Sequence, residues 1–245
     1  MRRSPLSPRS TLATTAALLL AGGLLGTAPA VAGDPTWFGA PPVGACFDLT
    51  LRQAAAPASP ELPVDCSQDH TLLVTAVALL PDDLTWDSPR RAILKAVNKV
   101  CGPAQAATIG RNRLQLYRSQ YRTYFFAPTA QQKSLGARWF DCLVAVPEDS
   151  RLTDLPLTPT PLSADLPDDV ARCVTRKRHF TTCADTHAWR SSYAFYARGK
   201  ATQSTVRRAA RRGCAGHLTS RKYLFSWWDV PGRRYVVGCY SQTRR

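Results

Sequence analysis

The sequence lacks the motifs by which common hydrolases, metalloproteins and redox proteins are recognised. It contains no Gly-x-Ser-x-Gly and no His-Glu-x-x-His, which would indicate a serine hydrolase or a zinc protease. It also contains no Cys-x-x-Cys, so neither a zinc ribbon nor a thioredoxin-like centre is indicated. These absences favour a binding protein over an enzyme. We expect no catalytic residue, no metal site and no cofactor.

Long apolar runs are also missing after residue 32, so no segment there is expected to cross a bilayer. Residues 1–32 have the pattern of a secretory signal peptide. An arginine pair at 2–3 precedes an apolar stretch at 11–26, and Ala-Val-Ala at 30–32 offers a cleavage site before Gly33. We therefore expect a secreted or cell-surface protein. The arginine pair leaves twin-arginine export open beside the general secretory route.

All eight cysteines follow the signal segment. An even number of cysteines in an exported chain predicts disulfides. They fall into two sets of four: Cys46, Cys66, Cys101 and Cys142, and then Cys173, Cys183, Cys214 and Cys239.

The two sets have the same surroundings in the same order, which indicates an internal repeat. A histidine stands four residues after the second cysteine of each set, as His70 and His187. A strand-like run follows, then a helix that ends at the third cysteine, then two further strands. The last strand has the order glycine, arginine, aromatic, cysteine in both sets. The second set has one extra residue before Cys239, which we expect a bulge at Gly238 to absorb.

We therefore predict an α+β fold of two small disulfide-stapled domains, each an antiparallel sheet with one packed helix. Copy one is predicted at 43–146, after a lead-in at 33–42, and copy two at 169–245. Residues 147–168 are dense in Pro, Ser, Thr and Asp and are predicted to form a linker.

Local signals predict where the helices and strands lie. Ser88 is a good helix cap and Gly102 a good helix end, while Thr202 or Ser204 can cap a helix that runs through Gly213. The strand-like runs are 71–80, 121–126 and 136–142 in copy one, and 188–198, 223–228 and 232–239 in copy two.

Size explains why such domains need disulfides. Copy two has only about 75 residues and can bury little apolar surface, and one disulfide contributes about 2–4 kcal/mol to the stability of a small domain. Pairing within each copy allows three connectivities per copy, and spacing leaves all of them open. We favour first-to-second and third-to-fourth pairing: Cys46–Cys66, Cys101–Cys142, Cys173–Cys183 and Cys214–Cys239.

The motifs of copy one resemble those of the septum-formation domain family of exported actinobacterial proteins. They are Gly44-Ala-Cys46, the stretch from Val64 through Cys66 to His70, Cys101, and the closing strand from Gly136 to Cys142. Copy two fits the pattern less closely, because Ala171, Thr181 and Tyr235 replace its glycine, valine and tryptophan. The resemblance implies a cell-envelope setting linked to septum formation.

Acidic residues are scarce in the second half of the chain. Residues 33–159 contain 12 basic and 12 acidic residues, whereas residues 160–245 contain 17 basic and 5 acidic residues. The positive excess therefore belongs to copy two. On its predicted helix, Arg207, Arg208, Arg211 and Arg212 fall within an arc of about 140°.

Such a basic surface attracts anions, and the planar fork of arginine suits phosphate and carboxylate. The alternative is a solvated face without a ligand. We predict an anion-binding surface and expect an anionic cell-wall or membrane polymer, or a lipid headgroup, rather than nucleic acid. Copy one is then a spacer or a module for an envelope protein partner. The predicted binding residues are Arg207, Arg208, Arg211, Arg212, Arg233 and Arg234.

Histidines are the remaining candidates for chemistry. The equivalent positions of His70 and His187 favour a structural role, in which each histidine closes the turn after its cysteine. The enzymatic alternative is a secreted ribonuclease or phosphodiesterase. In that reading His187 is the base, His179 or His217 is the acid, and arginines hold the phosphate.

Overall fold

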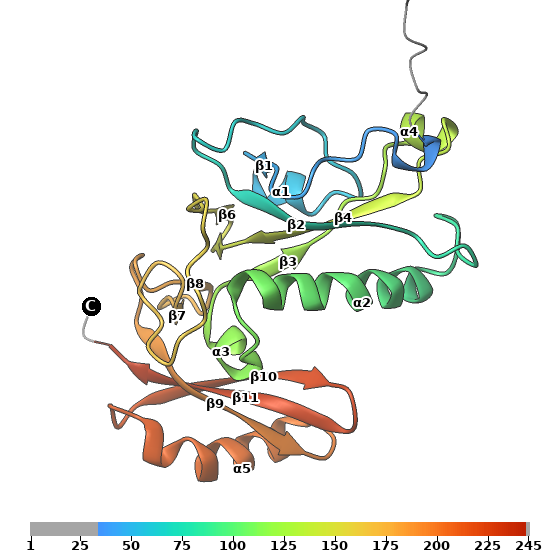
Figure 1. Cartoon of the computed structure of the whole chain (residues 1–245). Helices are drawn as coiled ribbons and strands as arrows, with labels where there is room; N and C mark the ends of the chain where they lie inside the picture. Colours follow the sequence, from blue (N-terminus) through green and yellow to red (C-terminus); the bar gives the residue numbers. More distant parts are fainter. Residues whose placement is uncertain (1–33, 244–245) are drawn as a thin grey trace, which may run out of the picture. The chain divides into compact units, whose positions relative to one another are not determined.

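A computed structural model describes residues 34–243, so the predicted signal peptide and the start at Gly33 lie outside the described residues. Copy one contains a four-stranded antiparallel sheet of order β1-β2-β4-β3, and helix α2 runs along one face of it (Figure 1). The elements of this half are η1 (Pro35–Trp37), β1 (Cys46–Phe47), α1 (Leu51–Ala54), β2 (Leu72–Leu79), α2 (Arg90–Ile109), α3 (Arg113–Arg118), β3 (Arg122–Tyr124), α4 (Ala130–Ser134) and β4 (Trp139–Ala145).

Copy two contains a five-stranded antiparallel sheet of order β10-β11-β9-β7-β8, with helix α5 along one face (Figure 1). Its elements are β7 (Arg172–Val174), β8 (Phe180–Thr182), β9 (Trp189–Arg198), α5 (Gln203–Gly213), η2 (Ala215–His217), β10 (Tyr223–Val230) and β11 (Arg234–Gln242).

The two sheets share one topology. If β1, β2, β3 and β4 are matched to β7, β9, β10 and β11, both sheets have the same strand order. Cys46 forms a bridge with Val64, and Cys173 pairs with Thr181 in the equivalent place. Both sheets also contain one register shift, which passes over Thr75 in β2 and over Ser192 in β9, each five residues after its histidine.

Four disulfides staple this α+β architecture, two in each half, and the described residues contain no free cysteine. The first bond of each half ties the opening strand to the turn before the histidine. The second ties the helix to the closing strand. The pairs are those favoured from the sequence: Cys46–Cys66, Cys101–Cys142, Cys173–Cys183 and Cys214–Cys239.

Helix α5 begins and ends where local signals predict. Thr202 is the N-cap and forms a capping box with Thr205, and Val206, Ala209 and Ala210 form the buried face. The last residue of the helix has to be glycine, because a Cβ on Gly213 would come within 2.3 Å of the Phe195 ring.

Helix α2 does not end at Gly102, as predicted, but continues to Ile109 with Pro103 inside it. The residues after the proline are rich in alanine, which favours helix, and Ile109 is fully buried in the core. Ser88 is not the helix cap either. Its hydroxyl accepts a hydrogen bond from the amide of Thr85 in the preceding turn.

The predicted bulge at Gly238 is wrong. Gly238 pairs in register with Ala194 on one side and Ser226 on the other. The sheet needs glycine here for another reason, because a Cβ would lie 3.1 Å from the Trp228 ring.

Residues of both halves enter one core cluster. Tyr121 and Val144 from copy one, Val170 and Cys173 from copy two, and Leu155 from the intervening segment all belong to it. That segment begins with a short hairpin of β5 (Pro147–Glu148) and β6 (Arg151–Leu152). Within residues 34–243, no helix combines the length and apolar character needed to cross a membrane.

Candidate functional site

The outer face of α5 carries the predicted arginines. Arg207, Arg208, Arg211 and Arg212 are all exposed, because the buried Val206, Ala209 and Ala210 hold the opposite face of the helix against the sheet. Within residues 34–243, none of the four guanidinium groups forms a hydrogen bond or an ion pair. Their charge is therefore directed entirely to solvent.

Arg233 and Arg234 lie at the hairpin between β10 and β11, and both are exposed. The carbonyl of Arg233 accepts a hydrogen bond from Gly199, which is three residues before the cap of α5. The Arg234 guanidinium lies over the Tyr196 ring, 5.3 Å from its centre. These two arginines therefore flank the side of the sheet on which α5 begins.

The structure adds two residues that were not in the predicted set. Arg221 lines two hollows near the C-terminal end of α5, of about 470 and 560 Å³, together with Thr219 and Ser220. Arg211 also lines the first hollow, and Arg176 also lines the second. The basic character of these positions is visible in the sequence. The sequence does not show that these residues lie close together in the fold, because they come from three separate loops and helices.

Few acidic groups oppose this charge. Between residues 170 and 243, the ion pair of Arg190 with Asp168 is the only one that involves a lysine or arginine. Exposed, unpaired cations raise the local potential and attract anions.

Arg172 is an exception, because it does not lie on the surface with its basic neighbours. It is 1 % exposed, and its guanidinium lies over the rings of Phe180 and Trp228 at 5.3 and 4.8 Å. Its Nε donates to Gln120 of copy one at 2.9 Å, and burial lowers its pKa. Arg172 therefore joins the two halves and is not available to a surface ligand.

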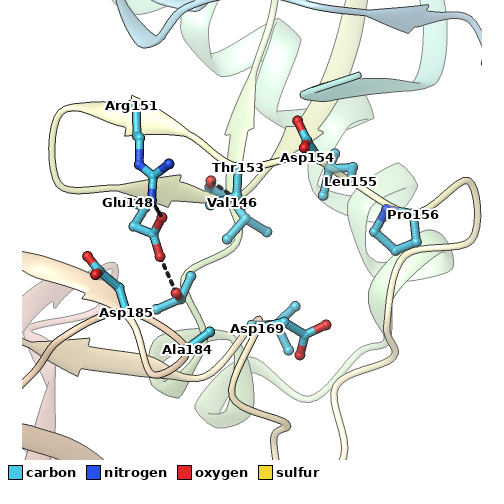
Figure 2. Close-up of a pocket in the computed structure, with 12 residues that line it drawn as sticks. Val146, Glu148, Arg151, Thr153, Asp154, Leu155, Pro156, Asp169, Ala184 and Asp185 are labelled. Atoms are coloured by element: carbon cyan, nitrogen blue, oxygen red, sulfur yellow. Dashed lines mark hydrogen bonds and ion pairs between the residues drawn. The ribbon is translucent and has the colours of Figure 1, made fainter. Parts of the chain in front are cut away.

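A separate pocket, of about 330 Å³, has four carboxylates and one arginine among its lining residues (Figure 2). Glu148 lies inside it and is 4 % exposed. One of its oxygens accepts from the Thr182 hydroxyl, and the other lies 2.5 Å from Arg151 Nη2. The remaining acidic lining residues are Asp154, Asp169 and Asp185.

Sequence analysis of each copy alone could not find this pocket, because its lining comes from the end of copy one, the intervening segment and copy two. Both oxygens of Glu148 are held by neighbouring side chains, so its carboxylate is an anchor between segments. Within residues 34–243, no group of three His, Cys, Asp or Glu side chains is placed to hold a metal ion.

The matched histidines have the same environment in both copies. His70 is 3 % and His187 is 4 % exposed. Nδ1 of each lies close to the carbonyl two residues earlier, at 3.0 Å from Gln68 and 2.7 Å from Asp185. A carbonyl can only accept, so Nδ1 carries the proton. Each histidine closes its turn.

The other two histidines of copy two lie in different surroundings. His217 stacks on Tyr193, with ring centres 3.6 Å apart, and His179 lies 2.8 Å from a carboxylate oxygen of Asp149. Tyr193 is six residues along the chain from His187, about 20 Å in an extended strand. The structure thus does not bring His217 to His187 as an acid–base pair.

Comparisons with protein-family models, with curated proteins and with solved structures found no match. The fold and the surface therefore define the class of the protein on their own. It is a tandem pair of disulfide-stapled α+β units, and the second unit carries a solvent-directed arginine surface.

Proposed function

We propose that the protein is a non-catalytic component of the cell envelope whose second copy binds an anionic polymer or lipid headgroup. The binding residues are the arginines of α5 (Arg207, Arg208, Arg211 and Arg212) and of the adjoining hairpin (Arg233 and Arg234). Arginine binds phosphate and carboxylate through paired N–H groups, and an array of arginines binds a repeating anion at several points.

One observation carries this proposal. The guanidinium groups of α5 are exposed and unpaired within the described residues, while the two halves share one fold and differ in charge. Residues 33–159 are neutral, with 12 basic and 12 acidic residues, and residues 160–245 have 17 and 5. Because the first half keeps the same fold with balanced charge, the fold itself does not require the positive excess of the second half.

The setting is supported by two further features. Four disulfides are typical of a protein that works in an oxidising compartment. The resemblance of copy one to septum-formation domains supports a place in the cell envelope during division. Copy one then positions copy two, as a spacer or as a contact to an envelope protein.

The test compares two charge reversals of equal size. In the first variant, the four arginines of α5 become glutamate. In the control variant, the four exposed cations of α2 become glutamate: Arg90, Arg91, Lys95 and Lys99. The purified oxidised proteins are mixed with an isolated anionic wall polymer and with anionic vesicles, and the bound fraction is measured by sedimentation at low salt.

The proposal predicts that the parent and the α2 variant bind and that the α5 variant does not. Equal loss in both variants would show a response to net charge alone and would contradict the assignment to copy two. Turnover of RNA that disappears in His187→Ala would replace the proposal by the hydrolase alternative.

A further inference from the structure

Two hollows lie side by side near the C-terminal end of α5, and they share three lining residues: Thr219, Ser220 and Arg221. The first hollow continues to Arg211 and Tyr223, and the second continues to Arg176 and Thr243. Because Arg221 lines both, each hollow has two arginines among its lining residues, one of them in common.

The guanidinium groups of these three arginines form no hydrogen bond or ion pair among residues 34–243. The hydroxyls of Thr219 and Tyr223 have no partner there either, and Thr243 Oγ1 is buried without one. The Ser220 hydroxyl, in contrast, is fixed, since it donates to the carbonyl of Lys222 and accepts from the amide of Gln242. It holds the loop against the last strand, so that the free donors around it keep their positions.

We propose that these hollows form a binding site for a phosphodiester chain and take two consecutive phosphate groups, one on each side of Arg221. This inference rests on the proposed function and names its ligand class and its centre. Each phosphate meets two guanidinium forks and a hydroxyl donor, which is the arrangement that phosphate oxygens require. The other arginines of α5 then attract the chain at longer range.

The lining favours a polyol phosphate over a membrane or a nucleic acid. Among the described residues of copy two, the large apolar or aromatic side chains that are exposed are Tyr196 and Trp227, and neither lines a hollow. Insertion into a bilayer needs exposed apolar side chains, and binding of single-stranded nucleic acid uses rings on which successive bases stack. Tyr223 is the one ring in the hollows.

The experiment removes the same number of charges inside and outside the hollows. The test variant is Arg176→Gln with Arg221→Gln, and its matched control is Arg198→Gln with Lys200→Gln, two exposed cations of copy two that line neither hollow. All four residues are exposed, so both variants should keep the fold, which near-ultraviolet circular dichroism checks. The probe is a short poly(glycerol phosphate), and affinity and stoichiometry are measured by calorimetry.

We expect the hollow variant to weaken binding about 100-fold, because two charge-assisted contacts are lost, and the control to weaken it only about threefold. Arg221→Lys should fall between them, since it keeps the charge without the fork. Equal losses in the two variants would overturn the hollow site and leave general binding by copy two intact. No binding by the parent protein would overturn both.

Two further probes decide the ligand class. Phosphatidylglycerol vesicles and single-stranded RNA are titrated with the same proteins. Tighter binding of either probe than of poly(glycerol phosphate), with the same dependence on Arg176 and Arg221, would overturn the assignment to a polyol phosphate chain.

Discussion

Asp141 is a buried titratable residue of copy one that has no titratable counterpart in copy two. It lies in the central strand β4 and is 1 % exposed. Its Oδ1 accepts from the amide of Phe126 at 2.7 Å, and its Oδ2 has no partner among the described residues. Burial raises the pKa of this carboxyl to about 7. The matching position of copy two is Gly238, since each residue stands one position before the cysteine at which the register shifts.

This carboxyl predicts a pH dependence of stability. Its pKa is about 7 in the folded protein and about 3.9 in the unfolded chain, so the folded protein binds more protons between these values. The contribution of Asp141 to the free energy of unfolding is therefore full below pH 4 and falls as the pH rises to 7, by on the order of 4 kcal/mol. Asp141→Asn keeps the Oδ1 acceptor and should remove this fall. Urea unfolding of both proteins at pH 5 and pH 8 tests it, and an identical pH dependence would contradict it.

Single residues were predictable when their partners are close in sequence. His70 and His187 bond to carbonyls two residues away, and their repeated position already indicated a structural role. Arg172 stands in a basic stretch of the sequence around Cys173, yet it is buried against Gln120 and Trp228. No pattern near Arg172 signals this, because Gln120 and Trp228 both stand more than 50 residues away in the chain.

At the scale of elements, helix α5 and the strands follow from local chemistry. The capping box of Thr202 and the spacing of the small apolar residues decide where α5 begins and which face is buried. Helix α2 shows the limit of such reasoning. Gly102 and Pro103 are strong stop signals, but the burial of Ile109 against residues of both halves outweighs them.

The disulfides give a prediction at this scale. Loss of a disulfide frees the loop that it closes, and the entropy cost grows with the logarithm of loop length. Cys101–Cys142 spans 41 residues and Cys173–Cys183 spans 10, and all four cysteines are buried. Replacing the first pair with alanine should lower the free energy of unfolding by about 1 kcal/mol more than replacing the second. Urea unfolding measures the difference, and a larger loss from the shorter loop would contradict it.

At the scale of the whole molecule, the two halves pack against each other. Helix α3 of copy one packs against β9 and β11 of copy two, and the Tyr117 ring lies 5.3 Å from that of Trp228. The repeat, and hence the shared topology, could be predicted from the cysteine pattern. The packing of α3 and the pocket around Glu148 could not, because they depend on contacts between halves that no periodicity encodes.

These contacts predict coupled stability. Tyr117→Ala should lower the free energy of unfolding by about 2 kcal/mol and loosen the sheet of copy two, although Tyr117 belongs to copy one. Native-state hydrogen exchange reports the stability of each strand separately. We expect the amides of β9 and β11 to lose protection together with those of β2 and β4. If the loss stayed within copy one, the halves would be independent.

The central claim is that copy two uses its solvent-directed arginines to bind a polyanion, and the salt dependence of affinity tests it most directly. The association constant of the oxidised protein for poly(glycerol phosphate) is measured from about 50 to 200 mM salt. We predict a linear fall of log K with log salt concentration. The slope should become shallower by about 3 when the four arginines of α5 become glutamine, and it should keep its value when the four cations of α2 are replaced in the same way. A slope that is the same for all three proteins would contradict the claim.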